Sequence, residues 1–379
     1  MPKDPNTKRT EKKEKPNSYD EIKELEERIA NTKYNKKTQG AIGLYKAKLA
    51  QLKEKRKTRA GIGVKDQGFS VRKSGDATVI MVGFPSVGKS TILNGITNAK
   101  SHVAAYAFTT LTVIPGQMDY GKAKIQILDV PGIVEGAATG RGRGKEVLSC
   151  AMSTDMVMFI VDALYPENLD VIKKEVYETN LRTNQQKPDI KITKKPKGGV
   201  EVWSTVKLTK LDAQTIKDIL KEFKILNADV VIRSDIDADQ LIDVVEGNKK
   251  YVPAITVLNK IDLVSKEQLE QIKQKLKPDI CISAELKINM EELKRLIFEK
   301  LRFIRIYCKE TGKKADMDVP MIMFKNSTLR DMCNKLHKDF STKFKFARVW
   351  GKSTRFPGQK ILKLDHKIED NDVIEIHVK

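Results

Sequence analysis

Residues 83–91 read Gly-Phe-Pro-Ser-Val-Gly-Lys-Ser-Thr and lie between an apolar run, 78–82, and a segment with helical periodicity. They fit G-x-x-x-x-G-K-[ST] at every fixed position, and a strand before and a helix after are the context in which this pattern binds phosphate. Its glycines let backbone N–H groups turn toward phosphate oxygens, and the helix N-terminus adds a favourable dipole. We therefore predict that a nucleotide is bound by Pro85, Ser86, Val87, Gly88, Lys89, Ser90 and Thr91.

The chemistry at the γ-phosphate is assigned to residues in and after this loop. Lys89 would reach the β- and γ-phosphates, and Ser90 would ligate Mg²⁺. Asp129 ends a second apolar strand in a D-x-x-G pattern, so its carboxylate would hold Mg²⁺ through water and the Gly132 N–H would contact the γ-phosphate. A threonine must also close over Mg²⁺ and the γ-phosphate. We predict Thr110 for this role, with Thr109 as the alternative.

A base-reading signature, N-K-x-D, is present as Asn259-Lys260-Ile261-Asp262 directly after another apolar strand. An aspartate at this position accepts hydrogen bonds from guanine N1–H and the 2-amino group, which adenine cannot supply, so the pattern indicates GTP rather than ATP. Asn259 would brace the loop and the stem of Lys260 would cover the base. Further along, a backbone N–H of Ser283 or Ala284 would contact guanine O6.

Short apolar strands alternate with helical segments from residue 77 onward, which is typical of a doubly wound parallel α/β sheet. We predict strands at 78–82, 123–129, 156–162, 254–259 and 280–283, and helices at 89–98, 145–152, 166–181 and 290–303. The interval before 254 is too long for one crossover. It predicts a small α/β insert, with a strand pair (191–194 and 200–206) joined by a turn, a helix, a third strand (229–233) and a second helix.

The whole chain divides into six predicted parts. Two amphipathic helices, about 19–32 and 39–57, form an N-terminal helical hairpin after an arm whose composition is that of disordered segments. The last part alternates short strands with one helix. The boundaries that we expect are 1–17 for the basic arm, 18–60 for the hairpin, 61–182 and 249–301 for the nucleotide-binding domain, 183–248 for the insert and 302–379 for the C-terminal domain.

The net charge of +21 is concentrated in three stretches of the chain: its N-terminal end, one internal stretch and its C-terminal end. Lys and Arg outnumber Asp and Glu by 18 to 9 over residues 1–60, by 8 to 2 over 181–210 and by 18 to 10 over 302–379, whereas the rest carries 27 against 29. Three basic regions around a neutral middle indicate a polyanionic partner, RNA ahead of DNA or membrane. The four separated cysteines and the absence of a secretory signal or a membrane-spanning apolar run predict a cytoplasmic protein.

Taken together, these motifs resemble those of the Obg-related GTPases, and within them the developmentally regulated GTP-binding (DRG) proteins. The resemblance covers nearly the whole chain and rests on GFPSVGKST at 83–91, AAYAFTTLTVIPG at 104–116, KIQILDVPGIVEGA at 124–137, GRGRGKEVLS at 140–149, QLIDVVEGN at 240–248 and LNKID at 258–262. It implies an insert similar to a ribosomal-protein domain and a C-terminal TGS domain of β-grasp fold. It also implies a connection to ribosomes and translation, and a small regulatory partner protein.

One position departs from the general GTPase pattern. Many GTPases place a glutamine directly after D-x-x-G to orient the attacking water, and here that residue is Ile133, an apolar substitution that Obg-like GTPases share. We therefore predict slow hydrolysis without an activator. Some relatives bind K⁺ through an asparagine in the phosphate loop, where this chain has Ser86, so assistance by K⁺ is an open alternative. Arg141 or Arg143 could supply an arginine finger, or both could belong to a solvated segment.

The resulting hypothesis is a monomeric GTPase that converts GTP to GDP and phosphate as a switch on ribosomes or RNA. The hairpin, insert and TGS domain would contact RNA, with no membrane partner. In the TGS domain, Phe344 and Phe346 are expected in the core, and Trp350 in a loop suited to RNA contact. The alternative is an RNA-binding adaptor whose nucleotide is mainly structural, which Ile133 makes conceivable.

Overall fold

The computed structural model describes residues 18–33, 35–36, 38–59, 75–97, 114–129, 152–337 and 339–378. The predicted basic arm, most of the predicted helix at 145–152 and the residues just after the phosphate loop's helix lie outside these ranges. The chain divides into two compact units, residues 1–67 with 186–249 and residues 68–185 with 250–379. None of the helices among the described residues has the length and apolar character needed to cross a bilayer.

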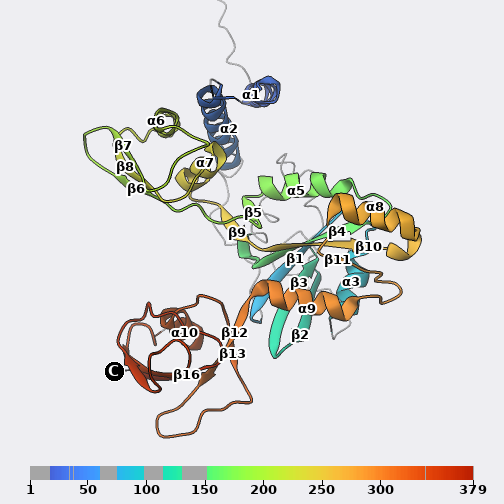
Figure 1. The fold of residues 1–379 in the computed structure, drawn as a ribbon, viewed down its shortest axis with the longest axis vertical. Helices are drawn as coiled ribbons and strands as arrows, with labels where there is room; N and C mark the ends of the chain where they lie inside the picture. The colour runs from blue at the N-terminus through green and yellow to red at the C-terminus, as the bar shows by residue number, and fades with distance from the viewer. Residues whose placement is uncertain are drawn as a thin grey trace, which may run out of the picture. The chain divides into compact units, whose positions relative to one another are not determined.

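The larger unit contains a six-stranded sheet in the order β11-β10-β4-β1-β3-β2 (Figure 1). All neighbouring strands are parallel except the edge strand β2, which is antiparallel to β3. The central strands are buried along their whole length, as expected where helices cover both faces. The strands are β1 (Ala77–Val82), β2 (Ile114–Tyr120), β3 (Ala123–Asp129), β4 (Met156–Asp162), β10 (Ala254–Asn259) and β11 (Ile280–Cys281).

Helices cover the two faces of this sheet, which confirms the predicted doubly wound fold. In β1, Val79 and Met81 pack against α3 (Lys89–Ile96) and α9 (Met290–Leu301). The alternate residues Ile80 and Val82 pack on the other side, where α5 (Asn168–Glu178) and α8 (Lys266–Leu276) lie. Figure 1 shows these two pairs of helices on opposite sides of the sheet.

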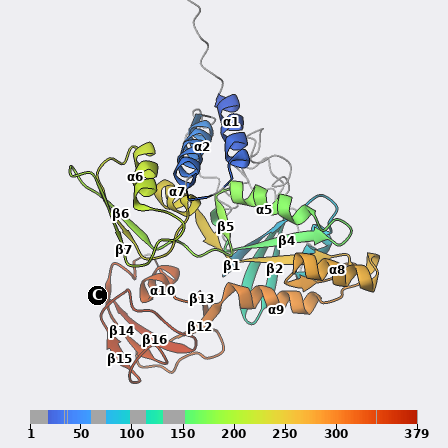
Figure 2. The ribbon, with the colours of Figure 1, turned by 45° about the horizontal axis from the view of Figure 1, so that its top comes forward.

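The smaller unit combines the N-terminal helices with the insert (Figure 2). Helices α1 (Ser18–Asn31) and α2 (Gln39–Arg59) form the predicted hairpin, which an ion pair between Glu26 and Lys53 links at 2.8 Å. Ala47 of α2 is fully buried in one hydrophobic cluster with residues of the insert. The hairpin and the insert therefore share a core. The insert consists of β6 (Ile190–Lys194), β7 (Val200–Ser204), α6 (Ala213–Glu222), β8 (Ala228–Ile232) and α7 (Ala238–Glu246).

The strand pairing predicted for the insert is wrong. Strands β6 and β7 are not paired with each other, because β8 lies between them in the order β6-β8-β7. β8 is antiparallel to β6 and parallel to β7, and α6 makes the crossover that parallel pairing requires. Alternate residues of β8 (Ala228, Val230 and Ile232) are fully buried, so the most apolar strand takes the central position.

The C-terminal part of the larger unit forms a second, five-stranded sheet in the order β13-β12-β16-β14-β15 around one helix. This is the predicted β-grasp arrangement, with β12 and β16 parallel at its centre. Its elements are β12 (Phe303–Cys308), β13 (Met321–Phe324), α10 (Leu329–Leu336), β14 (Phe344–Trp350), β15 (Gln359–Ile361) and β16 (Asp372–Val378). Two short strands, β5 (Leu181–Thr183) and β9 (Lys250–Val252), pair in parallel where the chain enters and leaves the insert.

The aromatic residues of β14 differ in their surroundings. Phe344 packs against the core of the β-grasp sheet, as predicted. Phe346 stacks on His377 instead, with ring centroids 4.2 Å apart. Trp350 is the last residue of the strand rather than part of a loop, and Nζ of Lys309 lies 4.3 Å from its ring centroid. The loop position predicted for Trp350 is therefore wrong.

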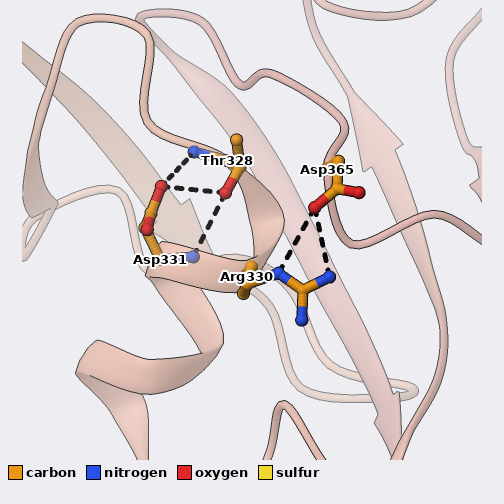
Figure 3. A network of polar contacts seen from close by, with 4 residues as sticks. All are labelled: Thr328, Arg330, Asp331 and Asp365. Atoms are coloured by element: carbon orange, nitrogen blue, oxygen red, sulfur yellow. Dashed lines mark hydrogen bonds and ion pairs between the residues drawn. The ribbon is translucent and has the colours of Figure 1, made fainter. Parts of the chain in front are cut away.

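Polar contacts fix the start of α10 (Figure 3). Thr328 is the N-cap, and its hydroxyl accepts a hydrogen bond from the backbone N–H of Asp331 while the Asp331 carboxylate accepts from the N–H of Thr328 at 2.8 Å. This reciprocal arrangement satisfies two donors at the helix end. In the same turn, the Arg330 guanidinium lies 3.1 Å from the carboxylate of Asp365.

Candidate nucleotide-binding site

The loop between β1 and α3 has the conformation that its two fixed glycines permit. Gly88 has φ 92° and precedes α3, and a Cβ at this position would lie 2.4 Å from Nδ2 of Asn259. At Gly83 a Cβ would lie 2.6 Å from the carbonyl oxygen of Ile160. Both contacts are shorter than any side chain tolerates, so the spacing of the motif follows from packing as well as from phosphate binding.

The N-terminus of α3 is open for an anion. Its N-cap is Gly88, which offers no side-chain oxygen, so no side chain caps the first N–H groups of the helix. The Nζ of Lys89 lies across the loop, donating to the carbonyl oxygens of Gly83 at 3.1 Å and Phe84 at 3.0 Å. The loop residues Pro85 and Ser86 are exposed, and so are Ser90 and Thr91 in the first turn of α3. Val87 is buried and anchors the loop to the sheet.

A hydroxyl and a carboxylate meet beside the loop. Ser90 Oγ donates to Asp129 Oδ2 at 3.2 Å, and the other carboxylate oxygen, Oδ1, is buried with no hydrogen-bond partner among the described residues. Burial raises the pKa of Asp129, against the opposing effects of Lys89 and the Ser90 hydrogen bond. A hydroxyl and a carboxylate that lacks one partner fit Mg²⁺, which usually takes only one or two protein ligands together with phosphate oxygens and water. Among the described residues, no group of three or more Asp, Glu, His and Cys side chains could hold a metal ion.

The remaining residues that the sequence analysis considered for the chemistry at the γ-phosphate lie outside the described residues. They are Thr109, Thr110, Gly132, Ile133, Arg141 and Arg143. The strands that flank them are described: Ile114, the first residue of β2, is paired with Asp129 at the end of β3. The roles of Thr110 and Gly132 therefore stay predictions.

The base-reading segment is tied to the phosphate loop through Asn259. Its side chain is buried, with Nδ2 donating to the carbonyl oxygen of Val87 at 2.8 Å and Oδ1 accepting from the N–H of Ala284 at 3.0 Å. One amide thus joins three loops that follow different strands. Asp262 lies in the short helix η2 (Ile261–Leu263) with its side chain exposed, where it is available to a ligand.

Hydrogen bonds within the protein already occupy the backbone N–H groups of the turn after β11. The N–H of Ser283 donates to the carbonyl oxygen of Ile288 at 3.3 Å, and its hydroxyl accepts from the N–H of Leu286 at 3.2 Å. The N–H of Ala284 is bonded to Asn259. Both N–H groups that we assigned to guanine O6 thus have protein acceptors, and contact with the base at Ser283 or Ala284 stays a prediction.

One residue of this site was missing from the sequence-based assignments. Asp162 ends β4, and its carboxylate lies 2.7 Å from Nζ of Lys260. The signal was present in the sequence, because Asp162 follows an apolar strand directly, as Asp129 does. In a parallel sheet the carboxyl ends of neighbouring strands meet at the same edge, where ligands bind.

Comparisons with known proteins agree with this geometry. Family patterns match the chain consecutively: "50S ribosome-binding GTPase" over residues 78–195, "C-terminal region of MMR_HSR1 domain" over 197–303 and "TGS domain" over 304–378. An uncharacterized GTP-binding protein of Methanocaldococcus jannaschii is 53% identical over 95% of this chain and 93% of its own length. Developmentally-regulated GTP-binding protein 1 of Xenopus laevis is 44% identical, covering 94% and 97%. Developmentally-regulated G-protein 3 of Arabidopsis thaliana is 45% identical, also covering 94% and 97%.

Proposed function

Because this chain belongs to the family of developmentally regulated GTP-binding proteins, we propose that it hydrolyses GTP to GDP and phosphate and acts as a switch on ribosomes or RNA. The observation that carries the proposal is the convergence at one sheet edge of an uncapped helix N-terminus, the Ser90–Asp129 pair and the exposed carboxylate of Asp262. These groups match the phosphates, the metal and the base of one nucleotide.

Each part of the site has a defined task in this proposal. Lys89 would exchange its contacts with the loop carbonyls for the β- and γ-phosphate oxygens, and the α3 N–H groups would bind the same phosphates. Ser90 and Asp129 would hold Mg²⁺, which when bound neutralises charge on the β- and γ-phosphates. Asp262 would read the guanine edge, and Asn259 would keep the base loop in register with Val87 of the phosphate loop.

The hydrolytic step depends on residues beyond the described ranges. In the proposal, Thr110 and the Gly132 N–H close over the γ-phosphate. Ile133 cannot orient water through a hydrogen bond, so hydrolysis is slow until a ribosome, a small regulatory partner protein or K⁺ assists. Ser86, with φ 63°, would be the loop residue nearest in role to the asparagine of K⁺-dependent relatives.

The distribution of charge supports the partner class. The basic excess lies in three stretches, 1–60 with the hairpin, 181–210 at the start of the insert and 302–379 with the TGS domain, whereas the remainder of the chain is close to neutral. Such surfaces favour a polyanion. The family pattern described as a ribosome-binding GTPase favours ribosomal RNA among polyanions. We propose that the chain acts as a monomer in the cytoplasm.

The test is single-turnover GTP hydrolysis by the purified protein in KCl, in NaCl and in KCl with ribosomes, with Lys89→Ala as the inactive control. We expect ribosomes or K⁺ to raise the rate at least about tenfold, which corresponds to about 1.4 kcal/mol of barrier. A rate that is the same in all three conditions and equal to that of Lys89→Ala would reject hydrolysis. Salt-sensitive RNA binding that is independent of nucleotide would then favour an RNA-binding adaptor with a structural nucleotide.

A further inference from the structure

The carboxylate of Asp162 is held firmly at the edge of the sheet that carries the nucleotide site. Asp162 is paired with Asn259 in the parallel register of β4 and β10. Its Oδ1 accepts a hydrogen bond from the N–H of Leu164 at 2.9 Å, and its Oδ2 lies 2.7 Å from Nζ of Lys260. The side chain is only 7% exposed. Both oxygens are therefore engaged, and the carboxylate cannot rotate without losing a contact.

The backbone of Lys260 requires such a restraint. Lys260 has φ 63° and ψ 39°, the left-handed conformation, which costs a residue with a side chain about 1–2 kcal/mol. A strained residue of this kind persists where its surroundings hold it in place. The ion pair with Asp162 does so here, and no other carboxylate in the described part of the chain pairs with Lys260.

The pair also determines where the lysine stem lies. With Nζ held at Asp162, the four-carbon stem must run from the β10 loop toward the end of β4. The Lys260 side chain keeps 30% of its surface exposed, so one side of the stem remains open for an apolar contact. A purine ring needs a flat apolar cover beside the carboxylate that reads its edge, and Asp262 lies two residues further along the same loop.

We propose that Asp162 is a positioning residue for guanine recognition, acting through Lys260. By binding the ammonium group, it holds the lysine stem against the plane of the base while Asp262 engages the edge of the base. Asp162 itself touches no atom of the nucleotide. This inference rests on the proposed binding of GTP and GDP, and it adds a residue from β4 to a recognition loop that otherwise follows β10.

The test is a double-mutant cycle on the release of fluorescent mant-GDP. Asp162→Asn keeps the size of the side chain and an oxygen for the Leu164 N–H but removes the charge, and Lys260→Met keeps an apolar stem but removes the ammonium. We expect Asp162→Asn to accelerate release about tenfold, a change worth about 1.4 kcal/mol. The double variant should release mant-GDP no faster than Lys260→Met alone, because the two residues act as one unit.

Two further measurements separate positioning from loss of structure. Inorganic tripolyphosphate has no base. Its dissociation constant, calculated from competition with mant-GDP and the GDP affinity of each protein, should therefore be the same for Asp162→Asn and for the unmodified protein. Asp279→Asn is a matched control. Asp279 also accepts a backbone N–H through one oxygen, from Thr256 at 2.9 Å, and a lysine through the other, from Lys300 at 3.0 Å, but it lies before β11, away from the loop. The Asp279→Asn variant should release mant-GDP at the same rate as the unmodified protein.

The inference is overturned if Asp162→Asn releases mant-GDP at the unmodified rate, if the effects of the two substitutions add in the double variant, or if tripolyphosphate binding weakens as much as GDP binding. Should Asp162→Asn fail to fold, Lys260→Met is the deciding variant, because Lys260 is the more exposed partner of the pair. Release of mant-GDP about tenfold faster, with unchanged tripolyphosphate binding, supports the inference. An unchanged rate of release rejects it. Failure of the unmodified protein to bind mant-GDP would instead reject the proposed function.

Discussion

In the proposed metal site, the Asp129 carboxylate is unfavourable to the free protein. It is 6% exposed, and within the described part of the chain one oxygen has only the Ser90 hydroxyl as a hydrogen-bond partner and the other has none. A buried anion with incomplete hydrogen bonding destabilises the folded protein, and a bound cation removes that penalty. The residue is therefore suited to a bound metal and poorly suited to the free protein.

We expect Asp129→Asn to stabilise the nucleotide-free protein at pH 7 by about 1–2 kcal/mol, since it removes a buried charge. Burial raises the pKa of Asp129 in the folded state, so the folded protein takes up a proton before the unfolded chain does. The advantage of the variant should thus be largest at neutral pH and shrink as the pH falls through the raised pKa toward the ordinary value of about 4.

Urea unfolding in EDTA at a series of pH values from 7 down to 4 measures this difference. Asp170→Asn, which removes an exposed carboxylate on α5, is the control for loss of one negative charge. An advantage that stays constant across this range would show that the pKa of Asp129 is not raised.

At the scale of elements, sequence prediction succeeded where a strand is buried on both faces. The predicted bounds of β3, β4 and β10 match the structure. β4 and β10 are nearly continuous apolar runs, whereas β3 is interrupted by Lys124 and Gln126 but ends, as β4 does, with an aspartate directly after apolar residues. The edge strand β2 was not predicted, because Pro115 and Gly116 are uncommon inside strands and are tolerated here at the edge. Helix α8 was not predicted either, because none of its residues is fully buried and its apolar face is weak.

The remaining differences arise from contacts between distant parts of the chain. Nothing in the local sequence of β6 and β7 indicates that β8 will separate them. The strand predicted at 280–283 ends at Cys281, because Ser283 forms a turn with Ile288. At the site, motifs predicted which residues would bind the phosphates, the metal and the base, whereas Asp162 required knowledge of which strand neighbours β10.

The contacts at the start of α10 predict unequal contributions from neighbouring residues. Thr328→Ala removes the N-cap and should lower the free energy of unfolding by about 1 kcal/mol. Arg330→Met should lower it by less, about 0–1 kcal/mol, because Arg330 and Asp365 are 49% and 81% exposed and water screens the pair. Urea unfolding of the full chain in a Trp203→Phe background, with Trp350 as the remaining tryptophan, measures both. A larger effect of Arg330→Met would contradict the assignment.

At the scale of the whole molecule, each unit has a hydrophobic core of its own. The nucleotide-binding residues all lie in the larger unit, together with the β-grasp sheet, whose Ile322 belongs to the same buried cluster as Val79 and Leu293. The chain has two tryptophans, and they report on different units: Trp203 on the smaller and Trp350 on the larger.

We expect GDP and Mg²⁺ to stabilise the two units unequally. At a ligand concentration one hundred times the dissociation constant, the free energy of unfolding reported by Trp350 fluorescence should increase by about 2.7 kcal/mol. The transition seen by Trp203 should not move. Urea unfolding of the Trp203→Phe and Trp350→Phe variants, with and without GDP, separates the two signals. Equal shifts would show that the chain unfolds as one cooperative body.

The shared core of hairpin and insert has a consequence for the nascent chain. Ala47 of α2 packs with Ile216 and Ile219 of α6, so the hairpin cannot bury its apolar face until the insert has left the ribosomal tunnel. At about 5–20 residues per second, the roughly 160 residues between Arg59 and Glu222, the end of α6, take on the order of 8–33 seconds to translate. During that interval α2 exposes an unpaired apolar face, which makes the newly made N-terminus a substrate for chaperones.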